Sequence, residues 1–388
     1  MINYNPNDRY SISFDVVFKL QSPLSHIGES IGNQSNLKTL KITDIQGESV
    51  DVFVYSGNAI RNGILRRKGM DSFLSQVGLQ VKPKVHQLLF AGGFIDGGTG
   101  SDLELDAKIR QLLPPLSVLG GAKPKGIFGC KEAQMLEGRI NIGDGILACF
   151  ESMEYLYNNY KPALPTNILT GLDQVLKAKQ DIENKRIEAW LNDEEIDIET
   201  AEYNNLLTEW VLFFEEKLKP YTQWLTWNQK VRMDSLKSPE LNKFLEKEKT
   251  EGQLLLLESD KPKQDKRKTT QQMIIGDWLL QAGATLHSRW NANITSVEEG
   301  FLIDAILKFA ESPYIGGKSA TGCGLVALDI YYSKKNESGK WLQIDVNSQL
   351  LGDRSKSKYS KYQSYLQEYR DLLADLKTGK ELRKLLGA

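Results

Sequence analysis

Alternating apolar and polar residues predict several strands near the start of the chain. The run YSISFDVVFKLQSP alternates like a half-buried strand and stops at Ser22-Pro23. Two further runs, KTLKITD and ESVDVFVY, predict strands on either side of a turn at Gln46-Gly47. A helix is expected from about Asn58, and Gly-rich loops follow it. We therefore treat residues 1–150 as the first region of the chain.

The apolar pattern changes its period after residue 150. Between residues 151 and 272, Leu, Phe and Trp recur at helical spacing, as in AEYNNLLTEWVLFFEEKLKPYTQWL. The run SPELNKFLEKEKTEGQ also predicts a helix, with Ser238 as its N-cap. The region ends in ESDKPKQDKRKTTQQM, a charged run that predicts a mobile loop because it has few apolar residues. Residues 151–272 are thus expected to be a largely helical insertion that ends in a basic mobile loop.

Strand patterns return in residues 273–388. TSVEEGFLIDAILKFAES predicts an amphipathic helix, and PYIGGKSATGCGLVALDIYYS predicts a Gly-rich loop that enters a strand. GKWLQIDV predicts another strand, and SKYQSYLQEYRDLLADLKTGKELRKLL predicts a terminal helix. Strands and helices at both ends of the chain, with a helical insertion between them, predict an α+β fold. In this fold, one sheet is completed by both ends of the chain.

Composition narrows the class of protein. The chain has 388 residues, of which 40% are hydrophobic and 26% charged, as in ordinary globular proteins of two or three domain-sized units. The three cysteines, Cys130, Cys149 and Cys323, are widely spaced, which argues against a disulfide framework and a zinc site. The same sparse cysteines favour a reducing cytoplasm. Because no signal core or apolar run long enough to span a bilayer is present, we expect no membrane contact.

Motifs of nucleotide-binding enzymes and hydrolases are missing from the sequence. Gly317-Lys318-Ser319 lacks the first glycine of a P-loop, and GGFIDGGTG lacks the dinucleotide-binding spacing. His26, His86 and His287 form no metal-binding pair. We therefore expect no catalytic residue, no bound metal and no cofactor.

The run SGNAIRNGILRR is the first candidate for phosphate binding in a chain whose net charge is only −1. Its small residues would let the backbone approach a phosphate at a helix N-terminus with free N–H groups: Ser56, Gly57 and Asn58. Arg61 and Arg66 add charge, but α-helical spacing does not place them on one face. We expect Arg61 to contact a bound phosphate and Arg66 or Arg67 to be partly solvated. The alternative is a basic, exposed helix.

Three other stretches combine glycine or mobility with basic residues. In IGGKSATGCG, Gly316 and Gly317 would let the backbone come close to a phosphate, and Lys318 would pair with it. The alternative is a tight turn that leads into a strand. SVLGGAKPKGIFG carries Lys123 and Lys125 in the same way. KPKQDKRKTT is either a nucleic-acid clamp or a soluble tether, and its candidate contacts are Lys266, Arg267 and Lys268.

Three short motifs, taken in order, resemble those of a known family. SPLSHIGESIG follows the first strand, YSGNAIRNGILRR opens a helix after a later strand, and SPYIGGKSATGCGLVAL leads into a strand near the end. Their order and placement resemble the backbone subunits of class-one CRISPR effector complexes, the Cas-seven group of the RAMP superfamily. The resemblance covers parts of the first and third regions and leaves the helical region unmatched.

The resemblance implies an RRM-like, ferredoxin-like antiparallel sheet core. It also implies a subunit that polymerises along guide RNA (crRNA) in an antiviral interference complex. The partners would be guide RNA, a complementary target nucleic acid, further copies of the chain and other CRISPR effector subunits. Within the first motif, the resemblance adds Ser25 and His26 to the RNA-binding candidates.

RNA-cleaving members of this family carry an aspartate between the first and second motifs. Here that stretch reads ESIGNQSNLKTLKITD, with Asn33 and Asn36 near the expected place, and Asp44 matches only in a shifted alignment. We therefore expect a non-catalytic subunit of a type IV, type I or inactive type III-like complex. Two alternatives remain: an endoribonuclease subunit that uses Asp44, and a small-molecule enzyme whose Gly-rich loops hold a phosphorylated ligand.

Overall fold

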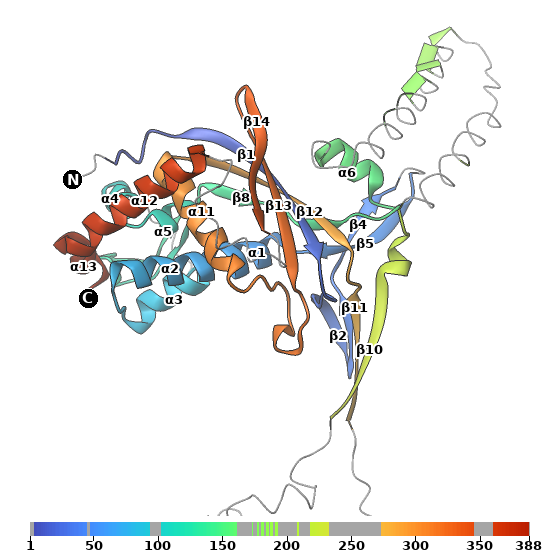
Figure 1. Ribbon diagram of the computed structural model, residues 1–388, viewed down its shortest axis with the longest axis horizontal. Helices are drawn as coiled ribbons and strands as arrows, with labels where there is room; N and C mark the ends of the chain where they lie inside the picture. The colour runs from blue at the N-terminus through green and yellow to red at the C-terminus, as the bar shows by residue number, and fades with distance from the viewer. Residues whose placement is uncertain are drawn as a thin grey trace, which may run out of the picture.

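The computed structural model describes residues 4–44, 47–93, 102–160, 218–232, 273–344 and 360–387, with short pieces between 173 and 208 (Figure 1). The basic run Lys266–Lys268 lies outside the described residues. Among the helices that these ranges contain, none is both long and apolar enough to cross a bilayer.

A large antiparallel sheet forms the centre of the molecule. Its strands follow the order β14–β13–β1–β12–β9–β5–β4, and β8 also pairs with β12. The strands are β1 (Tyr10–Leu20), β4 (Thr39–Thr43), β5 (Ser49–Tyr55), β8 (Ile140–Ile142), β9 (Gly145–Leu147), β12 (Thr285–Ile294), β13 (Val326–Lys334) and β14 (Glu337–Ile344). β1 pairs with β12 on one side and β13 on the other, which confirms that both ends of the chain complete one sheet.

Most described helices gather on one side of this sheet (Figure 1). They are α1 (Gly57–Ile60), the π-helix η1 (Arg61–Arg66), α2 (Arg67–Val77), α3 (Pro83–Ala91), α4 (Leu103–Leu112), α5 (Pro114–Leu119), α11 (Ser296–Ala310), α12 (Ser360–Thr378) and α13 (Lys380–Leu386). The C-terminal segment, predicted as one helix, is two helices because Gly379 adopts an extended conformation between them.

The helix α11 is the central helix of this layer. It starts with a capping box, in which the Thr295 hydroxyl accepts the Glu298 N–H and the Glu298 carboxylate accepts the Thr295 N–H. Its prediction as an amphipathic helix was wrong, because even Glu298, Glu299 and Asp304 are buried. The cause is its position, since α11 packs against α12, α2 and α5 at once.

A second sheet has the order β10–β11–β3–β2. Its strands are β2 (Ile27–Ile31), β3 (Gln34–Leu37), β10 (Leu225–Arg232) and β11 (Met273–Leu280), and a short ribbon is formed by β6 (Gly121–Lys123) and β7 (Gln134–Leu136). The region 151–272 therefore contains a strand, β10, besides the expected helical material such as α6 (Met153–Tyr160). Apolar spacing alone had predicted helix up to Leu225, where the pairing of β10 with β11 begins.

The two faces of the large sheet differ in chemistry. Along β1, Ile12, Phe14 and Val16 are buried on the helix side, while Ser11 and Ser13 point to the other face, as the two-residue period of a strand requires. The outer face near the start of β1 is therefore polar.

Candidate nucleic-acid interface

Two polar cavities adjoin on this outer face. Their volumes are about 430 and about 710 Å³. Asn141 of β8 and Asn291 of β12 face each other in register and line both cavities. The smaller cavity is also lined by Gly57, Asn58, Arg61, Asn159 and Arg289, and the larger by Arg9, Asp106, Arg110, Glu137, Arg139 and Asn293, among others. Arginine and asparagine side chains therefore dominate this surface.

Strand alternation places the polar side chains of β12. Arg289, Asn291 and Asn293 are two residues apart, so all three face outward. Polar residues of β1 hold two of them: the Ser13 hydroxyl donates to the Asn291 side-chain oxygen (2.7 Å), and Arg289 donates to the Asp15 carboxylate (2.8 Å). Sequence analysis missed these residues, although the spacing in SRWNAN could have indicated them.

The π-helix η1 brings Arg61 and Arg66 together. Arg61 and Arg66 are five residues apart, which is more than one turn of an α-helix. The turn of a π-helix is wider, because its hydrogen bonds join residues five apart, so the two side chains lie on the same side of the helix. Arg61 donates to the carbonyl oxygen of Leu119, and Arg66 donates to the same oxygen (3.0 Å) and to that of Gly120 (2.9 Å). The prediction that the two arginines lie on different faces was wrong, because it assumed α-helical spacing.

Both guanidinium groups have neutral partners. Burial lowers the pKa of Arg61, and burial together with the charge of Arg61 lowers the pKa of Arg66 to about 10. Within the described ranges, no carboxylate forms an ion pair with either arginine. Buried positive charge without a counter-charge is costly, so an anion in the smaller cavity, which Arg61 lines, would stabilise both groups.

Arg66 does not reach solvent. Its exposure is only 2%, which contradicts its prediction as a direct RNA contact, while the neighbouring Arg67 is exposed. The carbonyl oxygens of Leu119 and Gly120 enclose its guanidinium group, as described above. Arg66 therefore makes no direct contact with a ligand, but its buried charge adds to that of Arg61 at the smaller cavity.

The N-terminus of α1 is capped by the protein itself. Ser56 accepts the N–H of Ala59 (3.3 Å), and the Asp144 carboxylate accepts the N–H of Gly57 (2.6 Å). The N–H of Gly57, which the prediction left free for phosphate, is therefore already bonded. Gly57 is needed for close packing, because a Cβ there would overlap the carbonyl oxygen of Ile142.

The three sequence motifs meet at the end of β5. The N–H of Gly317 donates to the carbonyl oxygen of Ser25 (2.8 Å), and the N–H of Ser56 donates to Nε2 of His26 (3.2 Å). Burial, helped by the charge of Lys38, lowers the pKa of His26, so its ring is the neutral acceptor that this bond requires. These contacts give the motif residues a role in joining distant parts of the chain.

The Gly-rich loop near the end of the chain is fixed by several contacts. Gly316 has φ 72°, its N–H donates to the Tyr55 hydroxyl (3.0 Å), and a Cβ there would overlap the carbonyl oxygen of Ser25. Lys318 also has a positive φ, 65°, and forms an ion pair with the buried Asp277 of β11. The predicted phosphate partner Lys318 is therefore already matched by a carboxylate.

Lys123 and Lys125 have different surroundings. Lys123 is 0% exposed and forms an ion pair with Asp106 of α4, which contradicts its prediction as a phosphate contact. Lys125, two residues later, is exposed. The strand β6 ends at Lys123 and turns this side chain inward, which the loop-like sequence did not reveal.

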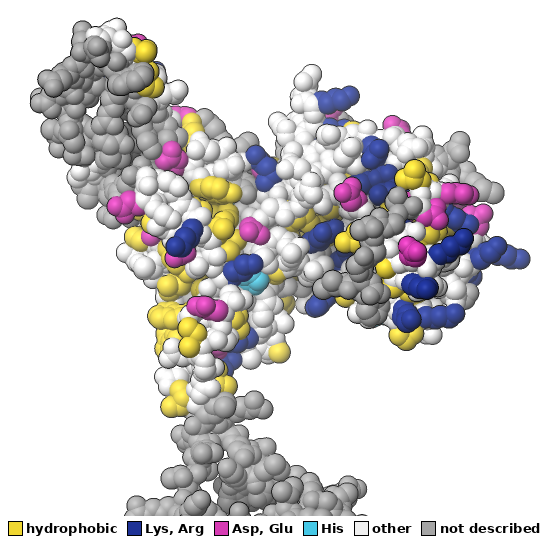
Figure 2. Space-filling model, turned by 180° about the vertical axis from the view of Figure 1, so that it is seen from behind, with side chains coloured by type: hydrophobic (Ala, Val, Ile, Leu, Met, Phe, Trp, Pro, Cys, Tyr) yellow, Lys and Arg dark blue, Asp and Glu magenta, His cyan; other side chains and the backbone are white. Residues whose placement is uncertain are grey.

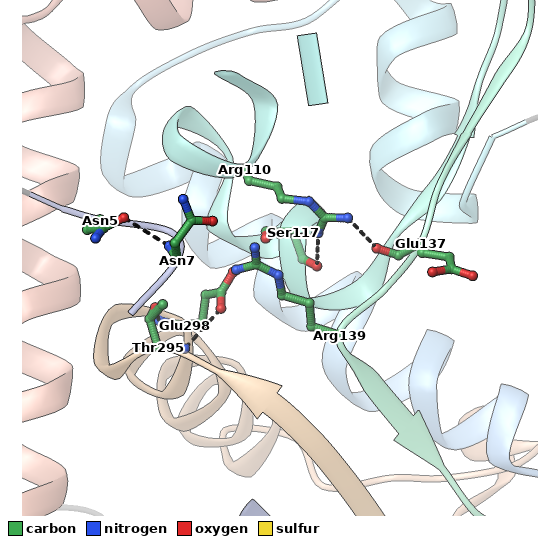
Figure 3. Close-up of polar contacts among 8 residues, drawn as sticks. All are labelled: Asn5, Asn7, Arg110, Ser117, Glu137, Arg139, Thr295 and Glu298. Atoms are coloured by element: carbon green, nitrogen blue, oxygen red, sulfur yellow. Dashed lines mark hydrogen bonds and ion pairs between the residues drawn. The ribbon is translucent and has the colours of Figure 1, made fainter. Parts of the chain in front are cut away.

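Arginines also line the wall of the larger cavity (Figure 3). Arg110 donates to the carbonyl and hydroxyl oxygens of Ser117 (both 3.3 Å) and to the carbonyl of Glu137 (3.0 Å), and burial lowers its pKa. Arg139 instead forms an ion pair with Glu298 (2.7 Å). Arg110 is thus a third guanidinium group with neutral hydrogen-bond partners at this surface.

Asp44 stabilises a turn. Its carboxylate accepts the N–H of Glu48 (2.9 Å) in the turn between β4 and β5, and it is buried. Over the described part of the chain, no three His, Cys, Asp or Glu side chains are grouped to hold a metal ion.

Exposed aromatic residues lie on the second sheet. Trp227 of β10 and Trp278 of β11 face each other with ring centroids 5.0 Å apart, and they are 40% and 37% exposed. Gly276 makes room for the ring of Trp227, which a Cβ would overlap. Ile31 and Ile274 are exposed as well, and Figure 2 shows hydrophobic side chains gathered over this part of the molecule. Sequence analysis assigned no role to this apolar surface.

Comparison with known proteins finds no matching family model and no matching curated protein. Among solved structures, the chain is similar to one titled "Type IV-B CRISPR Complex", with a TM-score of 0.42 and 14% identity over 86% of this chain and 96% of the other. It is also similar to one titled "Crystal structure of Thermofilum pendens Csc2", with a TM-score of 0.35 and 10% identity over 98% and 89%.

Proposed function

We propose that this protein is a non-catalytic backbone subunit that binds guide RNA in a multi-subunit CRISPR effector complex. The observation that carries the proposal is the pair Arg61 and Arg66, whose charge no described carboxylate offsets at the wall of a polar cavity. The phosphates of a single strand would supply that negative charge. Phosphate contacts position an RNA without reading it, so different guides would be accepted and their bases left to pair with target.

The order of the central strands supports an RRM-like core. Taken in chain order, β1, β9, β12 and β13 stand in the sheet as 4-1-3-2, with α1 and α2 between the first two and α11 between the last two. This is the order of a β-α-β-β-α-β unit, the ferredoxin-like arrangement. In such a core the outer face is open to single-stranded RNA, and here it carries the two cavities.

Two further sets of residues suit RNA bases and sugars. The amides of Asn58, Asn141 and Asn291 can hydrogen-bond to 2′-hydroxyls and base edges. The exposed rings of Trp227 and Trp278 can stack on bases without sequence preference. The charged cavities would hold the backbone, and the tryptophan pair would hold individual bases.

We propose no catalytic role for the chain. The Asp44 carboxylate is occupied by the turn between β4 and β5, so no specific observation favours the endoribonuclease alternative. The complementary target, other effector subunits and further copies of the chain would be the partners. The protein would act in the cytoplasm, where the three buried, unbridged cysteines stay reduced.

A salt titration of RNA affinity tests the proposal. A labelled single-stranded RNA is titrated with the wild type, Arg61→Gln and Arg67→Gln at several salt concentrations. Loss of one phosphate contact should lower the slope of log affinity against log salt by about 0.7 in Arg61→Gln. Arg67 is exposed, belongs to the next helix and lines neither cavity, so Arg67→Gln is the matched control and should keep the wild-type slope.

Arg110→Gln provides a second variant, at the adjoining larger cavity, because the hydrogen-bond partners of Arg110 are also neutral. It should lower the slope like Arg61→Gln. Wild-type slopes in both cavity variants, or absence of any affinity of the wild type for single-stranded RNA, would overturn the proposal. The absorbance ratio at 260 and 280 nm of purified protein adds a direct check for bound RNA.

A further inference from the structure

A third cavity lies where α3, α4 and α13 meet the loop after β6. Its volume is about 770 Å³. None of its lining residues lines the two polar cavities. Figure 1 shows α3 and α13 at the end of the molecule that carries the C-terminus, away from the second sheet. The proposed RNA interface therefore leaves this cavity without a role.

The cavity has an apolar floor and a positively charged rim. The floor residues are buried or half-buried: Val85, Leu105, Ile127, Phe128, Leu385 and Leu386. The rim carries four exposed lysines, Lys82, Lys84, Lys108 and Lys384. The lining contains no Asp or Glu, and none of these four ammonium groups forms an ion pair with a residue that the structure describes. In a chain of net charge −1, this is a strong local excess of positive charge.

The loop after β6 has a constrained shape at this cavity. Gly126 and Gly129 have φ values of 83° and 84°, and Phe128 between them has φ 55°, which bulky residues rarely adopt. The N–H of Gly126 donates to the carbonyl of Cys130 (2.8 Å) and closes the loop. The loop thus holds Ile127 and Phe128 in the floor of the cavity.

The lining indicates the chemistry of the ligand. Apart from the lysines, it has only Pro, Val, Leu, Ile, Phe and Gly, and no hydroxyl, amide or carboxylate side chain. A nucleotide base or a sugar would therefore find no side chain to read its polar groups. An acidic peptide that also carries aliphatic side chains would match both the rim and the floor.

The chain itself contains such a peptide. Residues 193–202 read DEEIDIETAE, with six acidic residues, no basic residue and two isoleucines, Ile196 and Ile198. No other stretch of ten residues in the sequence is as acidic. In Figure 1, the described pieces between residues 173 and 208, drawn in light green, lie at the opposite end of the molecule from α13. A second copy could supply this segment without the chain folding back on itself.

We propose that the third cavity binds residues 193–202 of a second copy of this chain. The six carboxylates would face the four lysines, and Ile196 and Ile198 would pack on the aliphatic floor. Because the cavity and the segment are different surfaces, the contact is head-to-tail and joins copies into a row instead of a closed pair. It requires no RNA, so it goes beyond the proposed function and is tested separately from it.

Peptide binding to the RNA-free chain is the first test. A labelled peptide of residues 192–203 is titrated with the full chain, and binding is followed by fluorescence anisotropy. The double variant Lys84→Glu/Lys384→Glu should bind about tenfold more weakly or worse. Lys41→Glu/Lys230→Glu, which reverses two exposed lysines outside the cavity, is the matched control and should bind like the wild type. Equal affinities for all three proteins, or binding of inorganic tripolyphosphate but not of the peptide, would overturn the proposal.

A charge swap in the whole protein is the second test. Sedimentation velocity at low salt should show self-association of the wild type. Self-association should be lost in the cavity variant, Lys84→Glu/Lys384→Glu, and in the segment variant, Glu195→Lys/Asp197→Lys. It should return when these two variants are mixed. Each variant alters one of the two surfaces and leaves the other intact. In the mixture, the intact segment of one variant can bind the intact cavity of the other, so restored association identifies the pairing. Failure of the mixture to associate when the wild type does would refute this contact while leaving RNA binding untouched.

Discussion

Lowering the pH should destabilise the protein through His287. This residue lies on β12 opposite Val17 of β1 and Ile146 of β9, and it is only 4% exposed. Burial lowers its pKa from 6.5 to about 4. At a pH between about 4 and 6.5, the imidazole of His287 is protonated in the unfolded chain but stays neutral in the folded chain. The stability that the neutral ring provides is therefore full above pH 6.5 and is lost as the pH falls towards 4.

The magnitude follows from the pKa difference. At pH 5.0 the medium is 1.5 units below the ordinary pKa of 6.5 and still above the folded value of about 4. Since one unit is worth about 1.4 kcal/mol, lowering the pH from 7.5 to 5.0 should cost about 2 kcal/mol through this residue alone. Other groups also titrate in this range, so the prediction concerns the difference between the wild type and a variant without this imidazole.

Urea unfolding, followed by tryptophan fluorescence at pH 7.5 and 5.0, measures this difference. The wild type should lose about 2 kcal/mol more than His287→Gln over the range. His86→Gln, which removes an exposed histidine stacked on Phe90, should behave like the wild type. Equal losses in the wild type and His287→Gln would refute the reasoning. So would an NMR titration of the wild type in which the His287 ring protonates near pH 6.5.

Three other predictions concern the interface and its supports. Trp227→Ala should weaken single-stranded RNA binding by about 1–3 kcal/mol at an unchanged salt slope, because stacking involves no counterion release, and wild-type affinity would contradict base stacking there. Gly57→Ala should lose about 1–3 kcal/mol in thermal unfolding, because its Cβ overlaps the Ile142 carbonyl. Gly63→Ala, with open space around its Cβ, is the control for that loss. Asp44→Ala should lose about 1 kcal/mol of stability and leave RNA affinity unchanged. Regular Mg²⁺-dependent cuts in target RNA that disappear in Asp44→Ala would revive the endoribonuclease alternative.

The sequence by itself determined most elements of the large sheet. β1, β4, β5, β13 and β14 all fall on runs that are rich in β-branched, aromatic or other apolar residues and that the sequence predicts as strands. The helix that starts at Gly57 was likewise indicated by the small residues that follow β5. The strand β10 was missed because its pairing partner β11 lies about 50 residues away, beyond the reach of local spacing.

The tertiary structure alone decided which basic residues are available to a ligand. Arg61 and Arg66 converge only because the chain forms a π-helix and the carbonyl of Leu119 lies opposite. Lys123 and Lys318 lose their availability to Asp106 and Asp277, partners that local sequence does not place near them. A charge can be read from the sequence, but whether it is compensated depends on groups brought close by folding, since the interaction falls with distance and not with sequence separation.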